Sequence, residues 1–326
     1  MNNGVPASGT SGCSTLGEAV VNLQVGGPQL TVNDYFQPYD YQNMDGGDRD
    51  FGSGGIALLD PTVFKGTNVN RMAVTAGKNG KIYILNADNL GGYMQGPGNT
   101  DRVIQSITTN EALFGGPGSY PLEGGYIYFT PVGYPTFAYK LGFDSSGNPS
   151  FNLVGQSNEV SAGRVGVGIP TVTSYKEKAG TGIVWMTDPN AGIRAWSAVP
   201  NNGILQPLTM PQIGGAVKFQ RPSFGNTRLY TTDSNGVLYC LGSPVNLPLN
   251  CTNLDFGQLA LGGIANGIVT CTANIAITEV SGMTVGDSHF QVSNSSLPIG
   301  KLNAGQSFRY DTIDDQVFCV FGYFFS

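Results

Sequence analysis

The chain has 326 residues, a formal net charge of −6 and only 12% charged residues, about half the ~25% usual in soluble domains. An acidic chain without a basic patch cannot neutralise many phosphates, which excludes nucleic acid as an expected partner. No apolar run approaches the ~20 residues of a membrane-spanning helix, so we expect no membrane insertion. The length leaves room for one large domain and a small one.

The first 17 residues are rich in Gly, Ser and Asn, and this composition predicts a disordered N-terminal segment, 1–17. The segment has neither the charged n-region nor the apolar core of a signal peptide. Low charge and abundant Asn, Ser, Thr and Gly are typical of secreted proteins. We therefore expect an extracellular location, although this chain carries no signal peptide pattern.

Glycine and proline punctuate the chain. The 48 glycines and 19 prolines fall mostly singly between short runs rich in Val, Ile, Tyr, Phe and Thr, which is typical of many short strands joined by turns. No segment shows a sustained 3.6-residue apolar period. The fold class predicted by this pattern is all-β, with almost no helix.

A strand pair is predicted at 19–25 and 30–36, and a connection dense in Asp and Gly follows at 35–55. Within it, Asp45, Asp48 and Asp50 offer hard oxygen ligands on a flexible loop, which suits calcium. Their spacing does not match an EF-hand. Aspartates in Gly-rich turns also bond their own backbone, so these residues are either metal ligands or turn formers.

A hairpin pattern recurs four times, at 71–87, 126–142, 182–198 and 228–242. In the first copy two apolar runs flank Asn-Gly, a strong signal for a tight hairpin turn. Each first strand ends in a threonine and each second strand carries an aromatic residue. The threonines are Thr75, Thr130, Thr187 and Thr232, and the aromatics are Tyr83, Tyr139, Trp196 and Tyr239.

A repeat of ~40–57 residues built on hairpins is typical of β-propeller blades. Flanking strands are expected at 56–60 and 102–108 for the first hairpin, near 151–154 for the second, at 165–173 and 204–210 for the third, and at 216–220 for the fourth. Together with the first pair these strands make an open arc, which exposes sheet edges. We interpret the chain as the C-terminal portion of a larger propeller, whose ring a missing segment or self-association completes.

The pattern changes after residue 243. Shorter alternating runs with turns every 8–12 residues predict a small β-sandwich framed by residues 256–257, 262, 268–271, 275–277, 290–292 and 305–308. The tail 311–326 is either its last strand or a poorly fitting end. Five cysteines without a Cys-x-x-Cys pair argue against zinc. A disulfide Cys240–Cys251 or Cys251–Cys271 is one reading, and reduced buried cysteines are the other.

The blade pattern resembles the quinoprotein-like (PQQ-like) repeat, in which a strand, a turn and a strand ending in Tyr or Trp recur. The connection YFQPYDYQNMDGGDRDFGSGG at 35–55 resembles one in secreted quinoprotein-like propellers, many of them fungal. Residues 251–308 are similar to Ig-like domains of the choice-of-anchor D group, related to the ASPM, SPD-2 and Hydin domains. The resemblance implies a propeller at 18–243 and an Ig-like sandwich at 244–326.

Quinoprotein alcohol dehydrogenases of this superfamily carry a vicinal cysteine pair, and no Cys-Cys occurs in this sequence. We therefore expect a non-catalytic extracellular binding or scaffold protein that has a carbohydrate or protein ligand and needs no cofactor. The alternative is a fragment of a pyrroloquinoline-quinone-dependent sugar or alcohol dehydrogenase that also uses calcium.

Further residues are candidates for ligand binding or catalysis, and each of them also has a possible structural role. Arg164 is a candidate anion-facing residue, while Trp185 and Trp196 are candidates for stacking a sugar or a quinone, or for packing between blades. Asp188 and Asp233 occupy equivalent turns, and this repetition favours a structural role over acid–base catalysis. The single histidine, His289, is expected in a surface turn, so we expect no Ser-His-Asp triad within this sequence.

Overall fold

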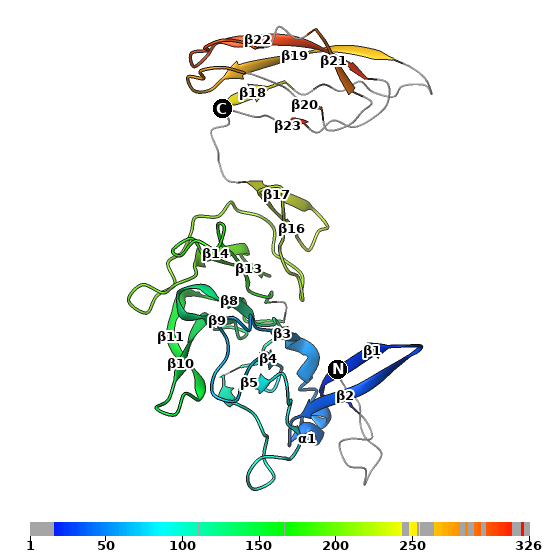
Figure 1. Cartoon of the computed structure of the whole chain (residues 1–326), viewed down its shortest axis with the longest axis vertical. Helices are drawn as coiled ribbons and strands as arrows, with labels where there is room; N and C mark the ends of the chain where they lie inside the picture. Colours follow the sequence, from blue (N-terminus) through cyan, green and yellow to red (C-terminus); the bar gives the residue numbers. More distant parts are fainter. Residues whose placement is uncertain are drawn as a thin grey trace. The chain divides into compact units, whose positions relative to one another are not determined.

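The computed structural model describes residues 16–109, 111–165, 167–242, 248–252, 254, 264–280, 284–285, 290–294, 298–314 and 321–322. The chain forms two compact units, Met1–Leu241 and Gly242–Ser326, and each is described by itself. The all-β class is confirmed, because the described elements are strands apart from one six-residue α-helix and two short 3-10 segments (Figure 1). The predicted disorder of 1–17 concerns mainly residues outside the described ones.

The first unit begins with the predicted strand pair, now β1 (Val20–Gly26) and β2 (Gln29–Gln37), which form an antiparallel hairpin. The turn passes through Gly27, whose φ of 77° favours glycine. A short strand that the sequence pattern did not indicate, β6 (Gly92–Tyr93), pairs with the end of β2 in parallel. The connection after β2 contains the helix α1 (Tyr41–Gly46) and the 3-10 segment η2 (Phe51–Gly54).

All four predicted hairpins are present. They are formed by β4 (Met72–Ala76) with β5 (Lys81–Asn86), β9 (Tyr126–Phe129) with β10 (Pro135–Phe143), β13 (Ile183–Asp188) with β14 (Gly192–Ser197), and β16 (Arg228–Thr232) with β17 (Leu238–Gly242). Each hairpin is the centre of a separate sheet.

Flanking strands complete these hairpin sheets. The first sheet is β3-β4-β5-β7, the second β11-β10-β9-β8, the third β12-β13-β14 and the fourth β15-β16-β17. The added strands are β3 (Ile56–Leu58), β7 (Gln105–Thr108), β8 (Gly118–Tyr120), β11 (Pro149–Val160), β12 (Thr171–Thr173) and β15 (Ser223–Gly225). A further 3-10 segment, η3 (Leu122–Gly124), follows β8.

Two predicted flanking strands were wrong. Residues 204–210 form no regular strand, although the N–H of Leu208 donates to the carbonyl of Ala195 at 2.8 Å. Pro207 lacks the N–H that a regular ladder needs. Residues 216–220 form no strand either, because Phe219 adopts a φ of 62°. The strand that pairs with β16 is instead β15, three residues further on.

Successive sheets pack face to face in chain order. All four residues of β9 are buried, and they alternate between two hydrophobic clusters. Ile127 and Phe129 pack against the first sheet, whereas Tyr126 and Tyr128 pack against the third. The Tyr128 hydroxyl donates to the carbonyl of Ala198 at 2.6 Å. The second sheet is therefore covered on both faces by its neighbours.

Glycines allow the backbones of neighbouring sheets to approach closely before their first strands. A Cβ added to Gly116 would lie 2.3 Å from the carbonyl oxygen of Gly54, and one added to Gly115 would lie 2.2 Å from that of Gly168. A Cβ on Gly168 would lie 2.8 Å from the Gln220 carbonyl oxygen. The same kind of contact thus links segments that belong to successive sheets.

The second unit contains a four-stranded sheet in the order β18-β19-β22-β21 and a two-stranded pair, β20 with β23 (Figure 1). The strands are β18 (Leu249–Cys251), β19 (Ala265–Ala273), β20 (Thr284–Val285), β21 (Phe290–Asn294), β22 (Ser307–Asp314) and β23 (Phe321–Gly322). A small core beneath the sheet includes Leu249, Val269 and Cys271.

The sequence pattern predicted the strands of this unit only in part. The runs 268–271 and 290–292 lie in strands, and β22 extends into the tail through Asp314. The run 275–277 was wrong as a strand, since Ile277 makes only an isolated bridge to Leu302. Residues 256–257 and 262, together with His289, lie outside the described residues.

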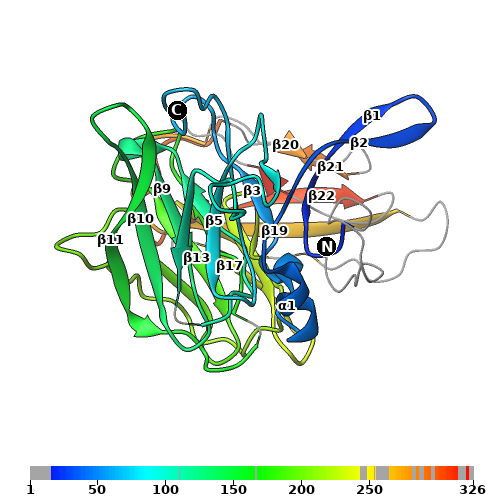
Figure 2. The ribbon, with the colours of Figure 1, turned by 90° about the horizontal axis from the view of Figure 1, so that it is seen from below.

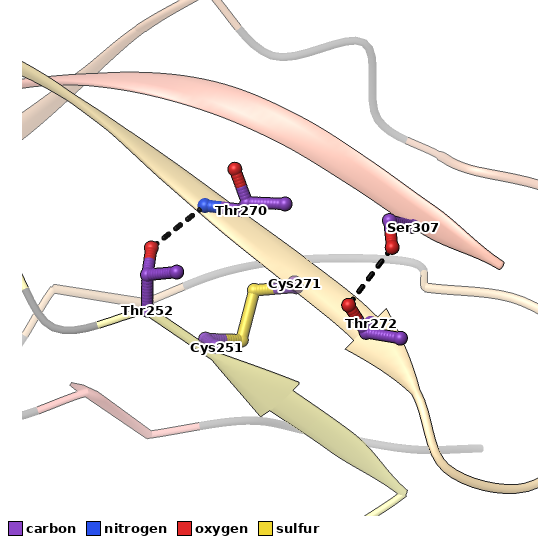
Figure 3. Close-up of a disulfide and its surroundings, with 6 residues drawn as sticks. All are labelled: Cys251, Thr252, Thr270, Cys271, Thr272 and Ser307. Carbon is purple, nitrogen blue, oxygen red and sulfur yellow. Dashed lines mark hydrogen bonds between the residues drawn. A yellow bond between two sulfur atoms is a disulfide. The ribbon is translucent and has the colours of Figure 1, made fainter. Parts of the chain in front are cut away.

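A disulfide joins Cys251 of β18 to Cys271 of β19, which face each other in the antiparallel register (Figure 3). Of the two pairings considered, the structure therefore forms the one that staples the unit's first two strands. Beside it the Thr252 hydroxyl accepts a hydrogen bond from the N–H of Thr270 at 3.0 Å. Cys240 is a free, exposed thiol.

Candidate functional site

A groove of about 590 Å³ lies in the first unit between β1 and the first hairpin sheet. Its volume falls within the ~300–1,000 Å³ of small-molecule sites. The lining is mostly apolar, with Phe51, Ala73 and Leu90 shared with a buried cluster. Ile56 and Leu58 of β3 form one wall, and both are exposed. The groove is thus a continuation of the hydrophobic core that opens to solvent.

The wall formed by β1 presents its backbone edge. Side chains of a strand alternate between two faces, yet residues 19–23 all line the groove without a gap. This pattern arises when a groove runs along the edge of a strand. β1 is the outermost strand of its sheet, and β3 is the outermost strand of the first hairpin sheet. Edge strands carry backbone N–H and C=O groups that are free to pair with another strand.

Two polar side chains at the groove, Arg71 and Thr75, are already engaged by the protein itself. The Arg71 guanidinium lies 2.5 Å from the Asp88 carboxylate at the surface, and the Thr75 hydroxyl donates to the Gly55 carbonyl at 2.8 Å. Both Arg71 and Thr75 line the groove. The arrangement favours an apolar strand or chain segment over a highly charged ligand.

Two of the three candidate calcium ligands, Asp48 and Asp50, pair with a lysine. The Lys78 ammonium pairs with Asp50 and lies 3.2 Å from an Asp48 oxygen. The hydrogen bond to Asp50 is the main cause that raises the pKa of Lys78 above its ordinary value. The backbone carbonyl of Asp45 accepts the N–H of Asp48 at 3.3 Å. A cation at Asp48 and Asp50 would have to displace this ammonium.

No group of three or more His, Cys, Asp and Glu side chains that could hold a metal is found within the described part of the chain.

A second charged cluster was missed by the sequence analysis. Lys81 reaches Asp40 at 3.1 Å and lies 5.3 Å above the Tyr39 ring. Asp101 accepts the N–H of Tyr39 at 2.7 Å. Burial raises the pKa of the Asp101 carboxyl above its ordinary value, and the Asp40 carboxylate raises it further. These residues come from three distant segments, so no local spacing could have indicated the cluster.

Replacing Asp101 by asparagine is expected to raise the melting temperature at pH 7. Because the folded state raises the pKa of Asp101, the ionised form destabilises the fold above that pKa, and the penalty disappears as the pH falls below the ordinary value of 3.8. Thermal melts should therefore separate Asp101→Asn from wild type at pH 7 and bring them together near pH 3.

The matched control is Asp144→Asn. Asp144 accepts hydrogen bonds from Asn148 and from the N–H of Ser146, and these bonds lower its pKa. This variant should lower the melting temperature at pH 7, which is the opposite sign. An Asp101→Asn variant less stable than wild type at pH 7 would contradict the assignment.

The sequence candidates for stacking and anion binding lie outside the groove. Trp196 is buried, and its indole N–H donates to Glu159 at 2.9 Å. Trp185 donates to the Thr173 hydroxyl at 2.8 Å, and its ring contacts Phe224 of the fourth sheet. Arg164 donates to the carbonyl oxygen of Pro189 at 3.0 Å and to the Asn190 side chain at 3.2 Å. None of the three candidates lines the groove.

The two turn aspartates hold their own hairpins. One oxygen of Asp188 accepts the N–H groups of Asn190 and Ala191 at 2.8 and 2.9 Å. Asp233 accepts the N–H groups of Asn235 and Val237 at 2.8 and 2.9 Å. The bond from Val237 is the main cause that lowers the pKa of Asp233. The repeated aspartate is therefore a turn-forming residue.

No family model matches this chain, and no curated protein matches it either. Within the part that the structure describes, no helix is long and apolar enough to cross a membrane. The fold and the groove together define the class: an all-β chain in which hairpin-centred sheets stack in series beside an apolar groove lined by strand edges.

Proposed function

We propose that this chain is a non-catalytic extracellular binding or scaffold protein, built from a quinoprotein-like β-propeller segment and an Ig-like β-sandwich. The observation that carries the proposal is the apolar groove between β1 and β3. Such a groove offers apolar contacts and unpaired backbone edges, which suit an extended protein segment better than a charged substrate.

The propeller part of the proposal is supported by the repeated sheets. Four hairpins, each flanked by further strands, pack in chain order through glycine contacts and shared clusters. A blade buries both faces only by stacking on its neighbours, and the fully buried β9 follows that pattern. For the Ig-like part, the support is a β-sheet unit with a separate core.

The binding role is supported by the structural contacts of the residues that were candidates for catalysis, metal binding or cofactor stacking. Asp188 and Asp233 hold turns, Asp48 and Asp50 pair with Lys78, and Trp196 is part of the core. The extracellular location is supported by the Cys251–Cys271 disulfide, because such bonds persist in oxidising compartments. A protein ligand fits the groove better than the carbohydrate ligand that the sequence left open.

A peptide-display selection on the full chain tests the groove. We expect the selection on wild type to enrich extended, apolar peptides. These peptides should bind the Ile56→Asp variant at least ~tenfold more weakly than wild type. Leu153→Asp is the matched control, since Leu153 is an exposed strand residue outside the groove. Selected peptides that bind both variants equally would contradict the groove as the binding site.

Titration with pyrroloquinoline quinone, with and without calcium, tests the enzyme alternative. The two tryptophans, Trp185 and Trp196, report on the first unit. The proposal expects no saturable, calcium-dependent quenching by the cofactor. Saturable quenching at micromolar cofactor, lost in Asp50→Asn, would replace the proposal with the quinoprotein dehydrogenase fragment.

A further inference from the structure

The distal half of the β1–β2 hairpin is an exposed ribbon with one apolar face. Leu23 pairs with Val32 and Val25 pairs with Leu30 across the two strands. Residues directly opposite each other point to the same side of an antiparallel ribbon, so all four side chains share one face. Their exposures are 45%, 52%, 83% and 64% in that order. Figures 1 and 2 show the ribbon projecting from the first unit in both views.

An isolated ribbon of this kind is marginal in water, and its edge lacks the usual protection. Exposed edge strands are commonly blocked by Lys or Pro, and neither residue occurs in β1 or β2. Among the described residues, the contacts that anchor the ribbon lie at its base. There Asp34 accepts the N–H of Leu90 at 2.6 Å, and Phe36 of β2 pairs with Gly92 of β6.

The charge distribution favours a second copy of this chain as the occupant. In a two-fold arrangement β1 would lie beside the same strand of the partner, so charges of one sign on this strand would repel across the interface. β1 carries no charge at all, and the single charge of β2, Asp34, is engaged by backbone N–H groups. Two copies can therefore approach edge to edge without repulsion between these strands.

We propose that two copies of this chain associate through β1, whose free edge pairs in antiparallel fashion with the same edge of a second copy. The inference rests on the proposed binding function of the groove and names its partner. A pairing centred on Leu23 sets Val25 of one copy opposite Val21 of the other, so the apolar faces of the two ribbons lie on the same side of the joined sheet. The paired strand of each copy then lies along the edge of β1 that lines the groove of the other.

Sedimentation velocity of the full chain over a range of concentrations tests the association. The measurement uses a Cys240→Ser background, because the exposed thiol of Cys240 could cross-link copies. We expect a concentration-dependent dimer. Val25→Lys should raise the dissociation constant at least ~tenfold, since the substitution occurs once in each copy. Val25 is 83% exposed, so its replacement leaves the monomer fold intact.

Thr31→Lys is the matched control, because Thr31 lies on the opposite, polar face of the same ribbon and on the inner strand β2. This variant should dimerise like the background protein. Hydrogen exchange should show protection of residues 20–25 that increases with protein concentration and is lost in Val25→Lys.

A monomer at all concentrations would overturn the inference, as would a dimer that Val25→Lys leaves unchanged. Protection of β1 in a monomer would also overturn it, because the chain's own residues would then cover the ribbon. The peptide selection tests the proposed binding function independently of the dimer. If the chain is a monomer but the groove still binds apolar peptides, the proposed binding function stands and only the dimer is ruled out.

Discussion

Replacing Gly115 by alanine is expected to destabilise the first unit by about 3 kcal/mol, at the upper end of the usual cost of overpacking. The added Cβ would lie 2.2 Å from the carbonyl oxygen of Gly168, and that oxygen belongs to backbone that cannot rotate away. Gly115 precedes the second hairpin sheet and Gly168 precedes the third. The substitution therefore pushes apart two neighbouring sheets at a point where their backbones lie close together.

Gly163→Ala is the matched control, because nothing lies within 4 Å of its added Cβ. Urea unfolding followed by tryptophan fluorescence measures the difference, since Trp185 and Trp196 both lie in the third sheet. Gly163→Ala should unfold like wild type. If Gly115→Ala unfolded at the same urea concentration as this control, the close approach of the two sheets would be wrong.

Removing the disulfide is expected to destabilise the second unit by about 3 kcal/mol and to leave the first unit unchanged. Cys251 and Cys271 are 20 residues apart in sequence, so the bond closes a loop that the unfolded chain would otherwise leave free. The double variant Cys251→Ser and Cys271→Ser removes the bond without leaving an unpaired thiol, and Cys240→Ser is the control.

Two probes separate the units in this experiment. The chain has two tryptophans, and both lie in the first unit, so fluorescence follows only that unit while far-ultraviolet circular dichroism follows both. The double variant should gain an early transition by circular dichroism and none by fluorescence. An early transition by fluorescence as well would show that the two units do not unfold separately.

The sequence predicted the hairpin at the centre of each sheet better than the strands that flank it. Asn79-Gly80 and the other turns fixed the four hairpins locally, because turn chemistry acts between neighbouring residues. The positions of the flanking strands depend on tertiary contacts. Gln220 donates to the Thr232 carbonyl at 2.7 Å, and this contact belongs to an irregular segment where a strand had been predicted.

Local patterns also failed where pairing partners lie far apart in the chain. β6 pairs with β2 across more than 50 residues, and only two residue pairs hold it. The helix α1 buries Tyr41 and Met44, which are three residues apart, within a connection too short to show a helical period. Neither β6 nor α1 has an apolar sequence pattern from which it could have been predicted.

The apolar ribbon next to the candidate site can be recognised in the sequence, whereas the groove itself cannot. Leu23 and Val25 precede the first turn at alternating positions, and Leu30 and Val32 follow it in the same way. That mirrored alternation indicates a ribbon with one apolar face. The opposite wall of the groove, Ile56 and Leu58, comes from a separate strand, and its position beside β1 depends on how the chain folds.

Three of the four repeated aromatics and both repeated turn aspartates have structural contacts in the described part of the chain. Tyr83, Tyr139 and Trp196 are buried within hydrophobic clusters, and Asp188 and Asp233 bond their own turns. A feature that recurs in every repeat answers a need that every repeat has, which is packing or turn formation.

Hydrogen exchange of the full chain tests the stacked arrangement of the sheets most directly. If β4, β9 and β13 are held by one another, their amides should be the most protected in the first unit and should open with a common free energy. The second unit should open with a different one. Hairpins that exchange independently of each other, with the buried strand β9 no better protected than β1, would contradict the account.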